Sequence, residues 1–582
     1  MATLSAHGRQ RVGTVNAVKQ TCKELPELKN NGEAEVTTKY GPITGEKFKL
    51  ANGYMCTGFR GIPFAKPPVG ELKFKKPEPP EPWTDPLQAK QFSSKCIQAF
   101  PGEPNESEDC LYLNVFAPAK PARGAGYPVM VWIHGGSLII GSASEFSMEG
   151  ILQNLVEKDV IIVTINYRLW IYGFFSTGDE QASGNWGFWD QTLALQWVRD
   201  NIHNFHGDPH SVTVFGESSG AESVSALALS PESSGLFQKL IIMSGSIGCS
   251  YAMLSKEYVH ETAVQLGEEL GCTDEAELAD CFRAKPSADI TNAVRAKAME
   301  SMSSLQSRFT LFQSHDFVHV LMSADYSRPV VDGAFFPESI QSLIGSAAQK
   351  PMLAGVTSAE IGAFINMVVG DPGTFFPSDY FTADFIRQKM GLFTRYGQYT
   401  PEQDAAVRDL MTKTYFDFQN SDKRKLANDF VQMLSDQLIH YCTFEDARTR
   451  ADHGWPAWFY VYDFVPPEWK DTWIDGAFHA SEIPFLFKDA FGVSMVRDGT
   501  KTAFDTPGDA DVMAHLSTLF TNFAKHGDPT NVEVGGVKWP PLAEGANPYL
   551  VINSALNVTD SFNSKLLELN KHKLPETIKA AV

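Results

Sequence analysis

A serine at the centre of a glycine-flanked turn is the residue in this sequence best suited to nucleophilic chemistry. The segment "SVTVFGESSGAESVSALAL" places the pentapeptide G-E-S-S-G, residues 216–220, between an apolar β-branched run and a helix-forming run. Glycines on both sides leave the space that a sharp strand-to-helix bend requires, and such a bend exposes the central hydroxyl. Ser218 is therefore the candidate nucleophile.

A serine hydroxyl attacks a carbonyl carbon only when a histidine removes its proton and a carboxylate orients that histidine. Where the serine lies in a strand–turn–helix segment, the order along the chain is nucleophile, acid, histidine. His479 in "WIDGAFHASEIPFLF" follows the apolar run "AWFYVYDF" and fits the last place. The acid could be Glu360 in "PMLAGVTSAEIGAF", Asp332 in "RPVVDGAFFP" or Asp475, and spacing alone does not choose among them.

The elements that must position these residues are short apolar runs with helical segments between them. Continuous apolar runs are typical of strands buried on both faces of a parallel sheet. The pattern predicts an α/β fold with a large, mostly parallel central sheet covered by helices on both faces, and a helix-rich cap region at about 250–440. The runs are "LYLNVFAP", "PVMVWIH", "VIIVTINY", "VTVFGE", "KLIIMSG", "PMLAGVT", "AWFYVYDF" and "PYLVI".

The chain reads as one large domain. Residues 1–35 are polar and unpatterned and predict a mobile N-terminal arm, residues 36–560 a single domain, and residues 561–582 a C-terminal tail. "EVTTKYGPITGEKF" predicts a hairpin that turns at Gly41-Pro42. Four large side chains at helical spacing are expected to pack in the core: Trp186, Trp189, Leu193 and Trp197.

Composition excludes several classes of protein. The 582 residues carry a net charge of −20, which repels phosphate backbones, so nucleic acid is not an expected partner. No run reaches the roughly 20 apolar residues of a membrane span. The N-terminal segment has no apolar core of a signal peptide, which favours a cytoplasmic location.

A metal site is not expected. The eight cysteines form no CxxC motif, so the zinc and thioredoxin-like interpretations are weak. His203, His206 and His210 lie close together in "NIHNFHGDPHS", but no carboxylate-paired motif accompanies them.

Several motifs together resemble the type-B carboxylesterase and cholinesterase family of α/β-hydrolases, from about residue 36 to about residue 555: "EDCLYLNVF", "VTINYRL", "GNWGFWDQTLALQWVRDNI", "FGESSGA" and "FAKHGDP". The resemblance implies an α/β-hydrolase fold and an esterase that needs no cofactor. It also implies a triad of Ser218, Glu360 and His479, although Ile361 stands where the family usually has glycine.

The same resemblance implies an oxyanion hole built from the backbone N–H groups of Gly136, Ser137 and Ser219. Ser137, in "WIHGGSLIIG", replaces the third glycine of the family's turn, and Trp170 also replaces a family glycine. If that turn needs a positive φ, serine adds roughly 1–2 kcal/mol of strain. Glu217 matches the family's buried acid beside the nucleophile and is expected to support the site.

The cysteines match the family's pairing pattern, which implies disulfides Cys96–Cys110 and Cys272–Cys281. Disulfides indicate an oxidising compartment, so a secreted or lumenal location is the alternative to the cytoplasm. Cholinesterases carry a tryptophan in the first loop that binds quaternary ammonium. Here the nearest aromatic residue is Phe100, so the chain is expected to be carboxylesterase-like rather than an acetylcholinesterase.

We therefore expect a serine carboxylic-ester hydrolase that cleaves small neutral esters through an acyl-enzyme. The alternatives are a catalytically weak scavenger that is acylated and released slowly, or a relative of the same family that acts through protein contacts. The natural substrate and the oligomeric state stay open.

Overall fold

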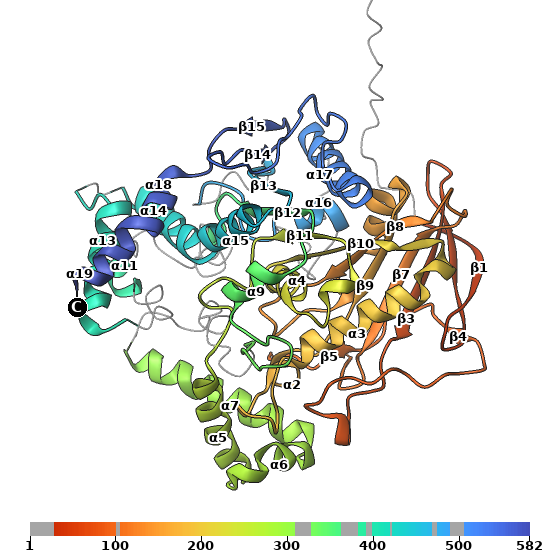
Figure 1. Ribbon diagram of the computed structural model, residues 1–582, viewed down its shortest axis with the longest axis horizontal. Helices are drawn as coiled ribbons and strands as arrows, with labels where there is room; N and C mark the ends of the chain where they lie inside the picture. Colours follow the sequence, from red (N-terminus) through yellow and green to blue (C-terminus); the bar gives the residue numbers. More distant parts are fainter. Residues whose placement is uncertain are drawn as a thin grey trace, which may run out of the picture.

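A 13-stranded sheet forms the centre of the computed structural model (Figure 1). The structure describes residues 28–100, 105–308, 328–362, 382–390, 399–419, 422–467, 474–488 and 506–581. Along its main path the sheet has the order β1-β2-β3-β7-β9-β8-β10-β11-β12-β13-β14-β15, and β4 (Leu87–Gln88) pairs with β2. Strands from distant parts of the chain are therefore neighbours.

The centre of the sheet is parallel, as the continuous apolar runs predict. It comprises β9 (Ile161–Ile165), β8 (Tyr127–Ile133), β10 (Gly207–Glu217), β11 (Lys239–Met243), β12 (Met352–Thr357), β13 (Ala457–Tyr462) and β14 (Tyr549–Ile552).

Both edges of the sheet are antiparallel. They comprise β1 (Lys29–Thr37), β2 (Pro42–Lys49), β3 (Met55–Pro63) and β7 (Tyr112–Pro118) on one side and β15 (Asn557–Thr559) on the other. Because β1 and β2 are joined by a short turn, they can only run antiparallel. The predicted hairpin at Gly41-Pro42 is confirmed, with Thr37 opposite Pro42.

Alternate residues of each central strand enter two different cores. In β8, Val131 and Ile133 belong to one buried cluster, whereas Met130 and Trp132 belong to the other. The first cluster lies under α3 (Trp186–Asn201), α4 (Ser219–Leu229) and α15 (Tyr441–Asp452), and the second under α16 (Ile483–Phe487) and α17 (Pro507–His526). The four side chains expected to pack in the core from α3 are all buried.

The region between about residues 250 and 440 is rich in helices, as predicted. Helices α5 (Lys256–Leu270), α6 (Leu278–Ala284) and α7 (Ser287–Arg308) form a lobe at the lower end of the view in Figure 1. The others are α9 (Ile340–Ser346), α11 (Ala383–Lys389), α13 (Pro401–Tyr415) and α14 (Lys423–Ser435). Shorter elements near the site are β5 (Lys95–Cys96), β6 (Glu106–Ser107), α1 (Met148–Gly150) and α2 (Trp170–Phe174).

The two ends of the chain differ from the expected boundaries. Residues 1–27 of the expected arm lie outside the described residues, but residues 29–35 belong to β1 because they pair with β2. The expected tail contains α18 (Ser564–Glu568) and α19 (Leu574–Ala580), and Leu566 and Leu569 are buried in the core. The polar composition of both ends concealed these contacts.

The structure contains both expected disulfides and a third between Cys249 and Cys442. The third pair is separated by 193 residues, so no local spacing could indicate it.

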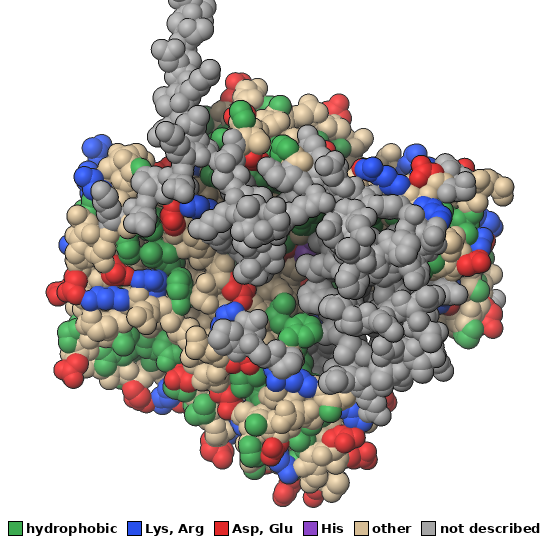
Figure 2. All heavy atoms as spheres, turned by 180° about the vertical axis from the view of Figure 1, so that it is seen from behind, with side chains coloured by type: hydrophobic (Ala, Val, Ile, Leu, Met, Phe, Trp, Pro, Cys, Tyr) green, Lys and Arg blue, Asp and Glu red, His purple; other side chains and the backbone are tan. Residues whose placement is uncertain are grey.

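In the described part of the chain, no helix is long and apolar enough to cross a membrane. Acidic and basic side chains are interspersed over the described part of the face in Figure 2.

Candidate active site

Ser218 lies in a sharp turn between β10 and α4, with φ 58° and ψ −126°. The two flanking glycines are required by close backbone contacts. A Cβ atom on Gly220 would lie 2.2 Å from the carbonyl oxygen of Ile133, and one on Gly216 would lie 2.6 Å from the backbone of Gly220. The predicted strand–turn–helix geometry is present, and it holds Ser218 in a strained backbone conformation.

The turn after β8 packs against this serine. Ile133 pairs with Gly216, and a Cβ atom on Gly135 would lie 3.0 Å from the Cβ of Ser218. Gly136 has φ 108°, and a Cβ atom there would lie 2.3 Å from the carbonyl oxygen of Ile140. Ser137 has φ 57°, so the condition under which serine strains this turn is met.

Three backbone N–H groups of the turn and of the start of α4 have no acceptor among the described residues. They belong to Gly136, Ser137 and Ser219. Leu138 N donates to the Oγ of Ser219 at 3.0 Å, which ties the turn to the start of α4.

Two of the three residues that replace family glycines, Ser137 and Trp170, lie on connected backbone segments. Trp170 has φ 53°, and its N–H donates to the carbonyl of Leu138, next to Ser137, at 2.6 Å. The guanidinium of Arg295 lies 5.9 Å from the Trp170 ring and donates to the carbonyls of residues 98–100. Trp170 thus links the turn to the loop closed by Cys96–Cys110.

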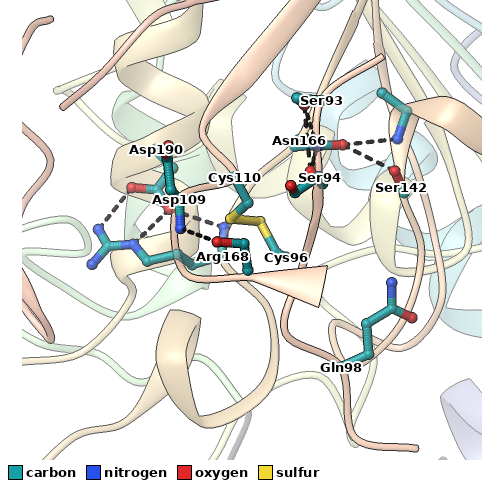
Figure 3. Close-up of a disulfide and its surroundings, with 12 residues drawn as sticks. Ser93, Ser94, Cys96, Gln98, Asp109, Cys110, Ser142, Asn166, Arg168 and Asp190 are labelled. Carbon is teal, nitrogen blue, oxygen red and sulfur yellow. Dashed lines mark hydrogen bonds and ion pairs between the residues drawn. A yellow bond between two sulfur atoms is a disulfide. The ribbon is translucent and has the colours of Figure 1, made fainter. Parts of the chain in front are cut away.

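The start of that loop and the residues before it also bond to the segment after the turn, and Figure 3 shows the disulfide with Gln98, Ser94 and Asn166. Gln98 exchanges two hydrogen bonds of 3.1 Å with the backbone of Gly141. Asn166 donates to the carbonyl of Ser94 at 3.1 Å, and its carbonyl oxygen accepts from Ala143 at 2.9 Å. The disulfide loop and the residue two positions before it are therefore connected to residues 141–143, which follow the turn that contains Gly136 and Ser137.

His479 and Glu360 are in direct contact. The Nδ1 atom of His479 lies 2.6 Å from Glu360 Oε2, and the other oxygen of Glu360 accepts from Thr357 N at 2.7 Å. The Nε2 atom of His479 faces Glu217 Oε1 at 3.0 Å, and Glu217 directly precedes Ser218. The structure thus brings His479 into contact with one of the three candidate acids and with the residue that precedes Ser218.

The other two candidate acids have different partners. Asp475 is exposed and forms an ion pair with Arg424 at 2.6 Å. Asp332 accepts a hydrogen bond from Phe336 N at 2.8 Å. The geometry therefore distinguishes among acids that sequence spacing left open.

The buried carboxyl groups change the protonation of the site. Burial raises the pKa of Glu217 to about 7. Burial alone would lower the pKa of His479, but Glu217 and Glu360 raise it to about 9. Burial also favours protonation of Glu360, but the hydrogen bond from His479 holds the pKa of Glu360 below its usual value. His479 is thus a strong base held between two carboxylates.

Glu482 is a buried acid that sequence reasoning missed. It lies three residues after His479 and is fully buried, and neither carboxyl oxygen has a hydrogen-bond partner in the described part of the chain. Burial, together with the charges of Glu217 and Glu360, raises the pKa of Glu482 well above its usual range. Only its apolar neighbours in "HASEIPFLF" could have suggested the burial of Glu482.

A model of the carboxylesterase family matches residues 32–569. The chain belongs to the carboxylesterase family. Acylcarnitine hydrolase of Mus musculus is 33% identical over 546 residues, covering 89% of this chain and 87% of that protein. Cocaine esterase of Homo sapiens is 32% identical over 570 residues, covering 93% and 92%. Acetylcholinesterase of Bungarus fasciatus is 30% identical over 577 residues, covering 94% and 88%.

Membership in the carboxylesterase family confirms the resemblance and the α/β-hydrolase fold predicted from the sequence. It also establishes the broad activity, hydrolysis of carboxylic esters, since the relatives are named as esterases and hydrolases. The family match begins at residue 32, within β1, and ends at residue 569, within the expected tail.

The close contact at Gly220 predicts that a larger residue there destabilises the fold. Gly220→Ala should lower the free energy of unfolding, measured by urea denaturation, by about 3 kcal/mol. This is the upper range for overpacking, because the added Cβ meets backbone rather than a flexible side chain. Gly235→Ala is the matched control, since a Cβ there has nothing within 4 Å. It should change stability by less than about 0.5 kcal/mol. Equal midpoints for the two variants would contradict the steric account.

Proposed function

We propose that this member of the carboxylesterase family cleaves neutral carboxylic esters through an acyl-enzyme formed on Ser218. His479 takes the proton of the Ser218 hydroxyl as the oxygen attacks the acyl carbon, and then gives it to the leaving alcohol. Glu360 orients the imidazole and stabilises its charged form. Water then attacks the acyl-enzyme with His479 again as the base, which releases the acid and restores Ser218.

The observation that carries this proposal is the 2.6 Å contact between His479 Nδ1 and Glu360 beside the strained turn of Ser218. A carboxylate on Nδ1 fixes the tautomer that leaves Nε2 free to accept a proton. The contact from Nε2 to Glu217, the residue before Ser218, supports an imidazole that lies next to the turn of the proposed nucleophile.

The oxyanion would be held by the N–H groups of Gly136, Ser137 and Ser219. Attack on the carbonyl carbon moves negative charge onto its oxygen, and each preorganised donor stabilises that charge by about 3 kcal/mol. Gly136 and Ser137 belong to the turn that packs against Ser218, and Ser219 is the first residue of α4. Glu217 would support the site by keeping Nε2 of His479 in place.

The serine at position 137, where the family has glycine, leaves two alternatives to an efficient enzyme. Ser137 has a strained backbone and a side chain where the family has none. Slow release of the acyl group would make the protein a scavenger, and loss of acylation would leave a protein-binding relative. The contact of His479 with Glu360, beside the turn that carries Ser218, supports the enzyme. The relatives above are named for three different substrates, so they support ester hydrolysis without selecting a natural substrate.

Burst-phase hydrolysis of a short-chain nitrophenyl ester tests the nucleophile. Ser218→Ala should lower steady turnover by at least about 10⁴-fold, because the acyl-enzyme cannot form. Ser137→Gly should raise turnover by less than about tenfold, since it relieves roughly 1 kcal/mol of positive-φ strain. A stoichiometric burst without turnover in the native chain would favour the scavenger. Neither burst nor turnover in the folded native chain would favour the binding relative.

The protonation of His479 predicts a pH dependence. The imidazole must be neutral to act as the base, so kcat/KM should rise with pH through the His479 pKa of about 9. Glu217→Gln removes a negative charge that raises this pKa. The acidic limb of the kcat/KM profile should therefore move to lower pH by about one unit. Glu232→Gln, at an exposed position outside the site, is the control. An unmoved limb in Glu217→Gln would argue against the Glu217 contact.

We also propose that the protein works in an oxidising compartment, the alternative to a cytoplasmic location. Three disulfides support this proposal. Alkylation of the natively isolated chain in denaturant without reductant, followed by peptide mass analysis, should label Cys56 and none of the six paired cysteines. Labelling of the paired cysteines before reduction would favour the cytoplasm.

A further inference from the structure

A second buried imidazole lies behind the carboxyl group of Glu360. It belongs to His440, the last residue of the π-helical turn η10 (Asp436–His440) between α14 and α15. Its Nδ1 atom lies 2.8 Å from Asp436 Oδ1, and its Nε2 atom lies 2.8 Å from the carbonyl oxygen of Thr357. Both ring nitrogens therefore face oxygen atoms.

The partners of His440 define its protonation. A carbonyl oxygen only accepts hydrogen bonds, so Nε2 must carry a proton. Both oxygens of Asp436 accept hydrogen bonds, Oδ1 from the amide nitrogen of Gln432 at 2.8 Å and Oδ2 from the Tyr415 hydroxyl at 3.0 Å, which is the pattern of a carboxylate. A proton on Nδ1 matches that acceptor. A ring protonated on both nitrogens, an imidazolium, therefore satisfies every contact of His440.

The electrostatic surroundings agree with this geometry. Burial alone would lower the pKa of His440, but Asp436 and Glu360 raise it above its ordinary value. The titratable groups that face His440 and its partner are Asp436 on η10, Glu360 after β12, and Tyr415 of α13, whose hydroxyl donates to Asp436 Oδ2 at 3.0 Å. The Glu360 and Asp436 charges favour the cation, and Tyr415 stabilises the charge of Asp436.

The cation acts on the backbone that holds Glu360. His440 donates to the carbonyl of Thr357, and the N–H of the same residue donates to Glu360 Oε1 at 2.7 Å. On the other side of Glu360, Ile361 N donates to the Oγ of Ser435 at 3.0 Å. The junction of α14 and η10 therefore fixes the backbone both before and after the acid.

We propose that His440 is a positioning residue, held as an imidazolium over the working pH range, that fixes the Thr357 backbone and keeps Glu360 ionised against His479. This inference rests on the proposed role of Glu360 in ester hydrolysis. Glu360 then lies between two imidazoles, of which His479 exchanges protons during turnover and His440 keeps its proton throughout. The fixed positive charge also opposes protonation of His479.

Two variants separate the charge of His440 from its hydrogen bond. His440→Gln can still donate to Thr357 but carries no charge, whereas His440→Leu does neither. Loss of the cation removes a charge that disfavours protonated His479, so the acidic limb of kcat/KM on a nitrophenyl ester should move to higher pH by about half a unit in both variants. His440→Leu should also lower kcat about tenfold, the loss typical of a missing outer hydrogen-bond partner.

A purely structural role would lower activity without moving the limb. Tyr415→Phe is a matched control because it removes a hydrogen bond to Asp436 and leaves the cation. His453→Gln changes an exposed histidine whose Nδ1 faces the carbonyl of Thr449. Neither control should move the limb. An unmoved limb in folded His440→Gln overturns the proposal, even if His440→Leu fails to fold.

Nuclear magnetic resonance of the full chain with ¹⁵N-labelled histidine tests the cation without relying on catalysis. The signals that disappear in His440→Gln should show two protonated ring nitrogens from pH 6 to pH 9. A neutral ring at pH 7 overturns the proposal. If Ser218→Ala retains turnover, the proposed function fails while this spectrum still reports the state of His440, so the two failures are distinguishable.

Discussion

The approach of the Gly220 backbone to the carbonyl of Ile133 is the constraint on which the rest of the site depends. It places the end of β8 against the start of α4. A Cβ atom at position 220 would lie only 2.2 Å from the carbonyl oxygen of Ile133, so no residue other than glycine fits there. Ser218 must then bend sharply out of β10, at φ 58°. The same contact brings the turn that follows β8 against Ser218, so that the proposed nucleophile and the proposed backbone donors lie on adjoining segments. A parallel sheet whose strands end at one edge provides this arrangement directly.

The second determinant of the site is the concentration of buried charge around one imidazole. Glu217, Glu360 and Glu482 are each at most 1% exposed, and burial disfavours the charged form of all three. His479 lies within hydrogen-bonding distance of the first two. Since an isolated buried carboxylate is costly, the site remains compact only if the charges are shared between imidazole and carboxyl groups. The upward shift of the Glu482 pKa disfavours a further negative charge beside His479.

Local sequence patterns predicted those features of the fold that depend only on residues close together in the chain. The turn at Ser218, the buried parallel strands, the hairpin and the packed face of α3 all follow from periodicity and glycine spacing. The choice among Glu360, Asp332 and Asp475 depends on which loop folds toward His479, and only the family resemblance decided it in the sequence. The Cys249–Cys442 disulfide and the contact from His440 to Thr357 join distant segments, so no local signal indicates them.

The departures from the family pattern are explained best when they are considered together. Ser137 and Trp170 look like independent losses of glycine in the sequence, yet the N–H of Trp170 donates to the residue after Ser137. Both have positive φ, so each alone would carry strain of about 1–2 kcal/mol. A glycine at position 170 would make the same backbone hydrogen bond to Leu138, but only the Trp170 ring can contact Arg295. At position 361 the backbone N–H bonds to Ser435 beside η10, a bond that glycine would also make. Trp170 therefore adds a side-chain contact to a neighbouring segment that glycine at this position would lack.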